Sequence, residues 1–438
     1  MRPERDTVLH SWCLQADWNA PTIVGGEGAW LHTGDGRRIL DLSSQAECSN
    51  LGHQHPKVVR AIREQAERLC FVSAAWGAEP RARLAERLLE KADMAEGRVF
   101  FTLAGADANE NAVKFARWAS GRPAGKILTR HRSYHGATHA AMALSGDTRA
   151  EGLPGLGLEG VVKVQPPDTY RSPFGGDTEA EEGRRAAAHV GEVLDRTPDA
   201  AAVLMEPDAG TNGVVPADTW WPALREETGR RGVLLIADEV MSGFGRVGAW
   251  FAWQRHGDAG RPDLFTLAKG LTGAHLPLGA VVVDGPVARA LEARTLMTGL
   301  TYCGHPLSCA AALAALEAYE SEDLISRSRE LGAELFTALK GLQAHHPVIG
   351  DVRGGRGLWA VLELVADRAT KAPLSPWDTP APALKRLVAR ALEEGVSLAM
   401  RGNLLFLAPP LVIAESDLAM AVALLDRLFA EVFTGTPA

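Results

Sequence analysis

The middle of the chain, from about residue 80 to residue 310, alternates short apolar runs with stretches of helical periodicity. The runs are continuously apolar, as expected of strands that are covered by helices on both faces. Strands separated by helices predict an α/β fold with a mostly parallel, doubly wound sheet. The best strand candidates are Arg98–Leu103, Ala201–Met205, Val233–Ala237 and Ala280–Val283.

Both ends of the chain have a different pattern. Residues 25–42 alternate short apolar runs with glycine-rich turns, which predicts a meander of two or three strands. Residues 322–438 predict a smaller α+β region in which helices and strands alternate irregularly. We therefore expect three parts: an N-terminal segment (1–60) that contributes to a small domain, a large domain (61–325) and a C-terminal small α+β domain (326–438).

Composition narrows the class of protein. At 438 residues the chain exceeds the size of one hydrophobic core, and 46% hydrophobic with 23% charged residues is ordinary for a globular protein. A formal net charge of −8 gives no indication of a nucleic-acid partner. No run reaches the ~20 apolar residues of a membrane span, and the N-terminus lacks the apolar region of a signal peptide.

The cysteines and histidines point to no structural cross-link. Five cysteines without a CxxC pair favour a reducing compartment over a disulfide framework, so we expect a cytoplasmic protein. Thirteen histidines are scattered and not grouped at ligand spacings, so we expect no metal site.

Two charged residues follow apolar runs at the carboxyl edge of the predicted sheet, where open α/β sheets bind ligands. Asp238 ends the run VLLIAD and could hold the nitrogen of a heteroaromatic ring protonated, or simply cap the next segment. Lys269 lies between Ala268 and Gly270 after a second run. Partial desolvation there would lower the pKa of its amine and make it nucleophilic, although most lysines are solvated surface residues.

A strand-to-helix turn supplies a candidate anion site. The run RVFFTL ends in Ala104-Gly105-Ala106, and a helix is expected immediately afterwards. Small residues before a helix let backbone N–H groups approach a phosphate, although an ordinary tight turn has the same pattern. Further along, RSYHGAT places Tyr134 beside Gly136, which suits a ring laid against a flat cofactor or ordinary packing.

These segments together resemble class III aminotransferases of the fold type I pyridoxal 5′-phosphate (PLP) superfamily. Five motifs in the family's order carry the resemblance: AGADANENAVKFAR, SYHG, DEVMSGFGR, LAKG followed by PLGAVVV, and GLTYCGHPLSCAAALAAL. The resemblance runs from about residue 20 to the end of the chain. The segment GTNG is most similar to the branch of taurine– and ω-amino-acid–pyruvate aminotransferases.

The resemblance implies PLP as the cofactor and assigns site residues one by one. Lys269 matches the lysine that holds PLP as a Schiff base, Asp238 the partner of the pyridine nitrogen, and Tyr134 the residue stacked on the ring. These three residues are the expected catalytic set. Thr301 matches a threonine that reaches the phosphate from the neighbouring subunit, which implies a homodimer with shared sites. The other expected cofactor-binding positions are Gly105, Ala106, His135 and Glu206.

Two departures from the family pattern bear on function. Ala104 and Ala106 stand where the phosphate turn usually carries Ser or Thr, and an uncompensated loss of one such hydrogen bond would cost ~1.5–3 kcal/mol. Thr211 stands where members that use glutamate often carry a second glutamate, the gate of an active-site arginine. Thr211 therefore predicts that pyruvate is preferred to 2-oxoglutarate as the amino acceptor.

Three residues are candidates for contact with the substrate. Arg401 resembles arginines that hold substrate carboxylates by a bidentate fork, and a surface arginine is the alternative. Glu47 stands where relatives place apolar or aromatic pocket residues. It favours a donor with a second cationic group, unless it is solvated or paired with an arginine. Trp76 is the third candidate.

The implied reaction is a ping-pong transamination between an amine or ω-amino acid and a keto acid. The freed amine of Lys269 would move a proton between the donor carbon and C4′ of the cofactor. Because fold does not fix reaction, a PLP-dependent aminomutase, epimerase or decarboxylase is an alternative. A non-catalytic scaffold or regulator is the alternative of another class, and the intact set of Lys269, Asp238 and Tyr134 argues against it.

Overall fold

Three sheets organise the part of the chain that the structure describes. The computed structural model describes residues 4–151, 159–377 and 379–433. The largest sheet has seven strands, which are, in spatial order, β4 (Arg98–Thr102), β10 (Gly279–Val283), β9 (Leu264–Leu267), β8 (Leu234–Asp238), β7 (Ala200–Met205), β5 (Lys126–Arg130) and β6 (Val161–Val164). Neighbouring strands pair in parallel from β9 to β6, whereas β10 runs antiparallel to both β4 and β9.

The predicted α/β fold with a mostly parallel sheet is confirmed. All four strand candidates lie in this sheet as β4, β7, β8 and β10, and every residue of β7 and β10 is buried, as their continuous apolar runs indicate. The apolar sequence of β10 does not indicate that this strand runs antiparallel to its neighbours. Strand β9 is the apolar run that precedes Lys269, whereas β5 and β6, which each carry a lysine, were not among the strand candidates.

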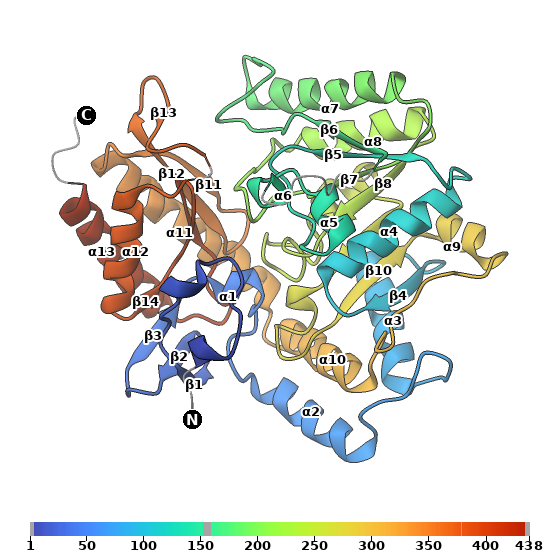
Figure 1. The fold of residues 1–438 in the computed structure, drawn as a ribbon, viewed down its shortest axis with the longest axis horizontal. Helices are drawn as coiled ribbons and strands as arrows, with labels where there is room; N and C mark the ends of the chain where they lie inside the picture. The colour runs from blue at the N-terminus through green and yellow to red at the C-terminus, as the bar shows by residue number, and fades with distance from the viewer. Residues whose placement is uncertain (1–3, 152–158, 378, 434–438) are drawn as a thin grey trace.

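Helices connect the strands and cover both faces of the large sheet (Figure 1). In the view of Figure 1, α7 and α8 lie above the sheet, whereas α2 and α10 lie below it. These helices are α2 (Pro56–Arg68), α3 (Glu79–Ala92), α4 (Gly105–Ala119), α5 (His139–Leu144), α6 (Thr148–Glu151), α7 (Glu179–Asp195), α8 (Trp220–Arg230), α9 (Gly285–Glu292) and α10 (Pro306–Ser321), with the 3₁₀ segments η3 (Ala252–Gly260) and η4 (Lys269–Leu271).

The two ends of the chain pair with each other. The predicted N-terminal meander is formed by β1 (Ile23–Glu27), β2 (Trp30–Thr33) and β3 (Arg38–Asp41). A C-terminal strand, β14 (Val396–Ser397), pairs in parallel with β3. This pairing supports an N-terminal contribution to the small domain, whose limits remain a prediction.

The C-terminal part has its own antiparallel sheet, which lies on the left of Figure 1 with the N-terminal strands. Its strands are β11 (Ile349–Gly354), β12 (Ala360–Asp367), β16 (Leu404–Leu407), β15 (Ala399–Arg401) and β13 (Ala372–Pro373). Its helices are α11 (Leu324–His345), α12 (Pro382–Glu393) and α13 (Glu415–Val432).

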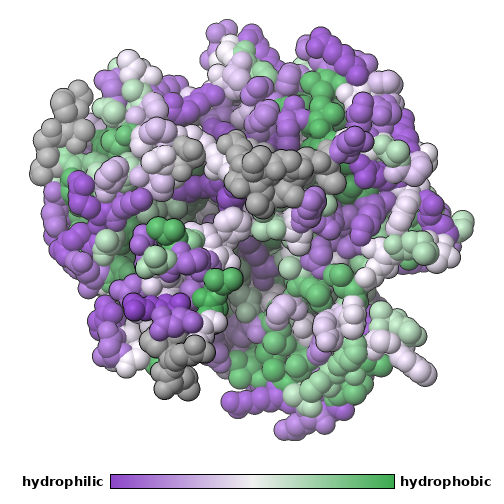
Figure 2. Space-filling view, viewed as in Figure 1, coloured by the Kyte–Doolittle hydropathy of each residue, from purple (hydrophilic) through white to green (hydrophobic). Residues whose placement is uncertain are grey.

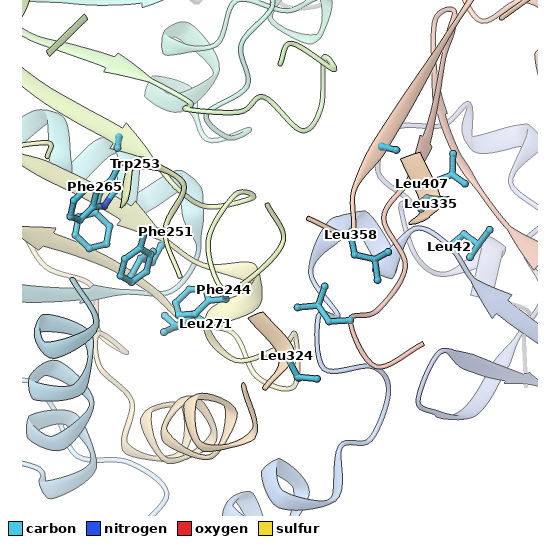
Figure 3. Packing of buried hydrophobic residues seen from close by; sticks show 14 of the residues in the cluster. Leu42, Phe244, Phe251, Trp253, Phe265, Leu271, Leu324, Leu335, Leu358 and Leu407 are labelled. Carbon is cyan, nitrogen blue, oxygen red and sulfur yellow. The ribbon is translucent and has the colours of Figure 1, made fainter. Parts of the chain in front are cut away.

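One hydrophobic cluster joins the large sheet to the small domain (Figure 3). Figure 3 shows Phe244, Phe251 and Phe265 together beside the large sheet, with Leu358 and Leu407 on the opposite side. The ring centroids of Phe251 lie 5.7 Å from Phe244 and 4.8 Å from Phe265, distances at which aromatic pairs add stability. This packing fixes the walls of the site relative to one another. Among the described helices, none is long and apolar enough to cross a membrane.

Candidate active site

A cavity of about 470 Å³ opens at the carboxyl ends of β4, β7, β8 and β9. This is the edge at which α/β sheets bind ligands, and the volume suits a small molecule. Four predicted residues line it directly after these strands or at their ends: Gly105, Glu206, Asp238 and Lys269. Ala106, Tyr134 and His135 also line it, so the structure gathers most of the expected cofactor-binding residues in one place.

Asp238 is held by a fixed set of hydrogen bonds at the floor of the cavity. Its side chain is buried, and Oδ2 lies 2.8 Å from Asn109 Nδ2 and 2.7 Å from His135 Nδ1. Oδ1 accepts a hydrogen bond of 3.0 Å from the backbone N–H of Val240. Buried polar groups need hydrogen-bond partners, and these three contacts fix the orientation of the carboxyl group.

Asn109 is a site residue that the sequence analysis missed. Besides donating to Asp238, it donates to the backbone carbonyl of His135 at 2.9 Å and accepts from Thr266 Oγ1 at 2.7 Å. It lies on α4 one turn after Gly105, inside the motif ADANENAV. The sequence could have indicated Asn109, because it lies four residues after Gly105 and residues four apart share a helix face.

The turn before α4 has free backbone donors at the cavity. The carboxylate of Asp107 accepts hydrogen bonds of 2.7 Å from the N–H groups of Leu103 and Ala104. Gly105 and Ala106 follow in the first helical turn, whose N–H groups have no partner within a helix. A Cβ atom at position 105 would come within 2.8 Å of Val240 Cγ1, so glycine is required there. Backbone groups can therefore take over part of the role of the missing hydroxyls.

The ring of Tyr134 has a cation on one face. The guanidinium carbon of Arg149 lies 3.6 Å from the Tyr134 ring centroid and 5.0 Å from that of Trp12. Arg149 also binds both carboxylate oxygens of Asp147, with the shorter contact at 2.6 Å. The tyrosine ring, which lines the cavity, is thus held by a cation–π contact of a kind worth ~0.5–2 kcal/mol.

Lys269 contacts Glu47, which is a candidate for contact with the substrate and whose predicted alternatives are exposure to solvent or pairing with an arginine. Its Nζ lies 2.9 Å from Glu47 Oε2. Burial acts to lower the pKa of the Lys269 amine, but the charge and hydrogen bond of Glu47 outweigh it and raise that pKa above its ordinary value. The sequence predicts a lowered pKa for the Lys269 amine. That prediction is wrong, because the nearby Glu47 outweighs the effect of burial.

Glu206 and Arg401 are both engaged in ion pairs. Glu206 Oε2 lies 2.6 Å from Arg130 Nη2, and burial raises the pKa of the Glu206 carboxyl although Arg130 opposes this effect. Arg401 Nη2 lies 3.2 Å from Asp147 Oδ2 and is not among the residues that line the cavity. Burial lowers the pKa of Arg401, and Asp147 opposes this effect.

The structure places Thr301 and Trp76 outside the cavity of their own chain. Thr301 is exposed, and Trp76 has 69% of its surface exposed. Their segments are neighbours, since the ring centroids of Phe71 and Tyr302 lie 5.5 Å apart. The side chains therefore lie on one surface of the molecule.

The residues at the cavity fit PLP. An amine from Lys269 and a fixed carboxylate from Asp238 lie on one cavity with an anion-binding turn and the ring of Tyr134. A Cβ at position 136 would come within 2.4 Å of Ala106 Cβ, so a second glycine keeps the chain close to the anion turn. Each of these groups suits one part of PLP: the amine suits the aldehyde, and the carboxylate suits the ring nitrogen. The turn suits the phosphate, and the tyrosine ring suits the flat face of the cofactor.

The family model of class III aminotransferases matches residues 15–429 of this chain. A leucine/methionine racemase from Thermococcus litoralis is 37% identical over 408 residues, covering 91% of this chain and 88% of the relative. A putrescine–pyruvate aminotransferase from Pseudomonas aeruginosa is 32% identical over 421 residues, covering 92% and 89%.

A solved structure extends the similarity to three dimensions. The taurine:2-oxoglutarate aminotransferase from Bifidobacterium kashiwanohense, in complex with PLP and glutamate, superposes with a TM-score of 0.94. The two chains are 36% identical, and the match covers 99% of this chain and 97% of the other. With the family model covering nearly the whole length, the chain belongs to the class III aminotransferases, PLP-dependent enzymes of fold type I that catalyse transamination.

Proposed function

We propose that this aminotransferase moves the amino group of an amine or ω-amino acid to pyruvate, in preference to 2-oxoglutarate, with Lys269 as the attachment point of PLP. The observation that carries this proposal is the convergence of Lys269, Asp238 and the Gly105 turn on one cavity. The relatives act on different acceptors, as their names state, so the acceptor rests on residues of this chain.

The roles of the side chains follow from their positions. PLP, when bound, supplies an aldehyde carbon for amines and a ring that accepts electrons. Lys269 would be the residue that holds that carbon, and its free amine would move a proton between the donor carbon and C4′. Asp238 would hold a proton on the ring nitrogen, because Asn109 and His135 fix the position of its carboxyl group. Tyr134 packs on the ring, and Gly105 and Ala106 bind the phosphate through their N–H groups.

Glu206 has a supporting role in this proposal. It lines the cavity and is tied to Arg130, which also donates to the backbone carbonyl of Arg132 at 2.6 Å. The pair thereby anchors the chain just before Tyr134. We assign Glu206 to the wall of the cofactor site.

The acceptor proposal rests on Thr211 and Arg401. Thr211 lines the cavity where a gating glutamate would stand, so the chain has no carboxylate there to hold an arginine aside. Arg401 instead contacts Asp147 and lies 3.4 Å from Thr148 Oγ1. We propose that Arg401 binds the acceptor's single α-carboxylate, and pyruvate carries no second carboxylate that would need another cation.

The donor proposal is affected by the pairing of Glu47. A donor with a second ammonium was expected because an unpaired buried carboxylate is costly. Lys269 already supplies a cation, so that argument applies only while the Lys269 amine is neutral. We keep the dicationic donor as a proposal for that stage of the cycle.

A homodimer is the proposed assembly. Several large apolar side chains near Thr301 are exposed, and Figure 2 shows hydrophobic surface gathered on the lower part of this face, near α2 and α10. Exposed apolar area of this kind marks an interaction surface. A second copy that covers it would bring Thr301, and with it Trp76, towards the other chain's cavity. The exposed side chains are Leu69, Phe71, Trp76, Met297, Leu300 and Tyr302.

Product analysis tests the reaction and the acceptor separately. With donor alone, the PLP-loaded enzyme should release one equivalent of carbonyl product per site and then stop until a keto acid is added. An epimerase would release none, and a decarboxylase would release carbon dioxide. Pyruvate should then restore the loaded form faster than 2-oxoglutarate. A clear preference for 2-oxoglutarate would overturn the acceptor proposal and leave transamination standing.

A further inference from the structure

The turn that carries Glu47 has a backbone conformation that side chains disfavour. α1 (Ser44–Glu47) is a left-handed turn, with φ angles of 46°, 49°, 70° and 56° at its four residues, none of which is glycine. Each such residue costs roughly 1–2 kcal/mol relative to a right-handed conformation. Backbone strain that persists in a folded protein is concentrated at functional sites, where surrounding contacts fix it.

Contacts from three directions hold this turn in place. Within it, the N–H of Glu47 donates to Ser43 O at 2.8 Å, and the N–H of Cys48 donates to Ser44 O at 2.9 Å. From outside, Ser44 Oγ donates to the carbonyl of Ala408 at 2.6 Å. The buried guanidinium of Arg246 donates to Ser44 Oγ at 3.1 Å. The turn is therefore fixed by both the large domain and the C-terminal sheet.

This arrangement brings the Glu47 carboxylate to the reactive amine. Glu47 Oε2 lies 2.9 Å from Lys269 Nζ, and their side chains are 11% and 24% exposed. Lys269 itself has a φ of 43°, so strained backbone stands on both sides of the contact. At this distance and burial, the pair interacts far more strongly than a surface salt bridge.

Other charged or titratable groups also act on this pair and its neighbour Arg246, among them Asp41 and Tyr319. Cys48 and Asp238 also act to raise the pKa of the Lys269 amine, after Glu47. On the other side, Arg246 lies close enough to the pair that the charge of Glu47 acts on its guanidinium, whose pKa burial lowers to about 10. Glu47 thus lies between one fixed cation, Arg246, and one reactive cation, Lys269.

We propose that Glu47 is a positioning residue that stabilises the positively charged form of the Lys269 nitrogen and so makes Lys269 a stronger base. The inference rests on the proposed attachment of PLP to Lys269. When Lys269 takes the proton of the donor carbon, the electron pair of that C–H bond stays with the substrate and cofactor, and Nζ becomes an ammonium. The ammonium then lies against the Glu47 carboxyl group, which is 2.9 Å from Nζ. When the ammonium gives the proton to C4′, Lys269 returns to the neutral amine.

Glu47→Gln tests this proposal through the spectrum of the loaded enzyme. The visible absorbance of PLP attached to a lysine follows the protonation of the linking nitrogen. Removing an opposite charge at this distance should move the midpoint of the pH titration down by about 1–3 pH units, a tenfold or larger change in acidity constant. The pH profile of the single half-reaction with donor should move in the same direction. An unchanged midpoint would overturn the proposal.

Two controls separate a charge effect from a packing effect. Glu322→Gln makes the same change at a half-exposed carboxylate that pairs with His55 and Lys57, and it should leave the midpoint in place. Glu47→Asp keeps the charge and should keep the midpoint within about half a unit of the parent, well inside the shift expected for charge removal. A fall in Glu47→Asp equal to that in Glu47→Gln would assign the effect to packing and overturn the proposal.

A third variant covers the case in which Glu47→Gln loads too little cofactor. Glu47→Ala opens space for a small carboxylate, so added acetate should return its lowered midpoint towards the parent value, whereas chloride at equal ionic strength should not. Absence of rescue together with a parental midpoint would overturn the proposal. Failure of the proposed function is a separate result, because it would place the borohydride-fixed cofactor on a residue other than Lys269 in the parent enzyme.

Discussion

The residues proposed to bind the cofactor and those proposed to contact the substrate are held in place by different interactions. On the cofactor side, Asp238 ends β8, and the Gly105 turn and Asn109 follow β4 of the same sheet. Asn109 donates to Asp238, which also accepts from the backbone N–H of Val240. The two residues proposed for substrate contact, Glu47 from the N-terminal part and Arg401 from the C-terminal part, are not among the residues that line the cavity, and each is engaged by an ion pair within the chain. The cofactor-side residues are fixed by the fold, whereas Glu47 and Arg401 are held by ion pairs.

The difference shows where reactivity and selectivity can change. Removing a cofactor-side group leaves a buried partner unsatisfied, which costs more than the lost bond is worth. The charges proposed for the substrate side already have partners, so a substrate that binds them would compete with Lys269 for Glu47 and with Asp147 for Arg401. We therefore expect large losses of rate from cofactor-side variants and selective changes from substrate-side variants.

Asp238→Asn should have the largest effect among the variants proposed for this comparison. An amide cannot hold a proton on the ring nitrogen by charge, so kcat should fall roughly 10²–10⁴-fold, as for loss of a group that positions a proton in the transition state. Half-reaction kinetics with donor would measure this. Asp195→Asn, at a surface pair with Arg231, is the matched control and should change kcat little. A twofold loss in Asp238→Asn would show that the ring nitrogen has another partner.

Arg401→Ala should have an intermediate and selective effect. Losing a charged hydrogen bond of ~1.5–3 kcal/mol should raise the KM for pyruvate about ten- to a hundredfold. A simple amine donor without a carboxylate should be used almost as well as by the parent. Steady-state kinetics with each substrate varied in turn would show the split. An equal loss of activity with the amine and with pyruvate would show that Arg401 has a structural role and does not bind the acceptor.

Thr301→Ala should have the smallest effect. Because Gly105 and Ala106 also offer donors to the phosphate, retention of PLP should weaken only up to about tenfold, without loss of folding. Dialysis followed by absorbance would measure retention, with Thr337→Ala on the exposed side of α11 as the matched control. Light scattering on the parent should give a dimer. A catalytically competent monomer would contradict the shared-site proposal.

The same contrast explains how much the sequence could predict. The large sheet and the cofactor side follow from short local patterns, since Asp238 ends one apolar strand and the small-residue turn at Gly105 follows another. Asn109 could also have been predicted from its helical spacing after Gly105. The pairing of β3 with β14 and the contact between Glu47 and Lys269 join residues far apart in the chain, and no local pattern encodes them. The left-handed turn at Ser44–Glu47 also lacks the glycines that normally reveal such a conformation.

Attachment of PLP to Lys269 is the claim on which the whole account depends. Borohydride reduction of the loaded enzyme, followed by proteolysis and peptide mass mapping, tests it most directly. We expect the reduced pyridoxyl group on Lys269, in the peptide containing LAKG, and no labelled peptide from Lys269→Ala. A label on any other lysine, or a label that persists in Lys269→Ala, would contradict it.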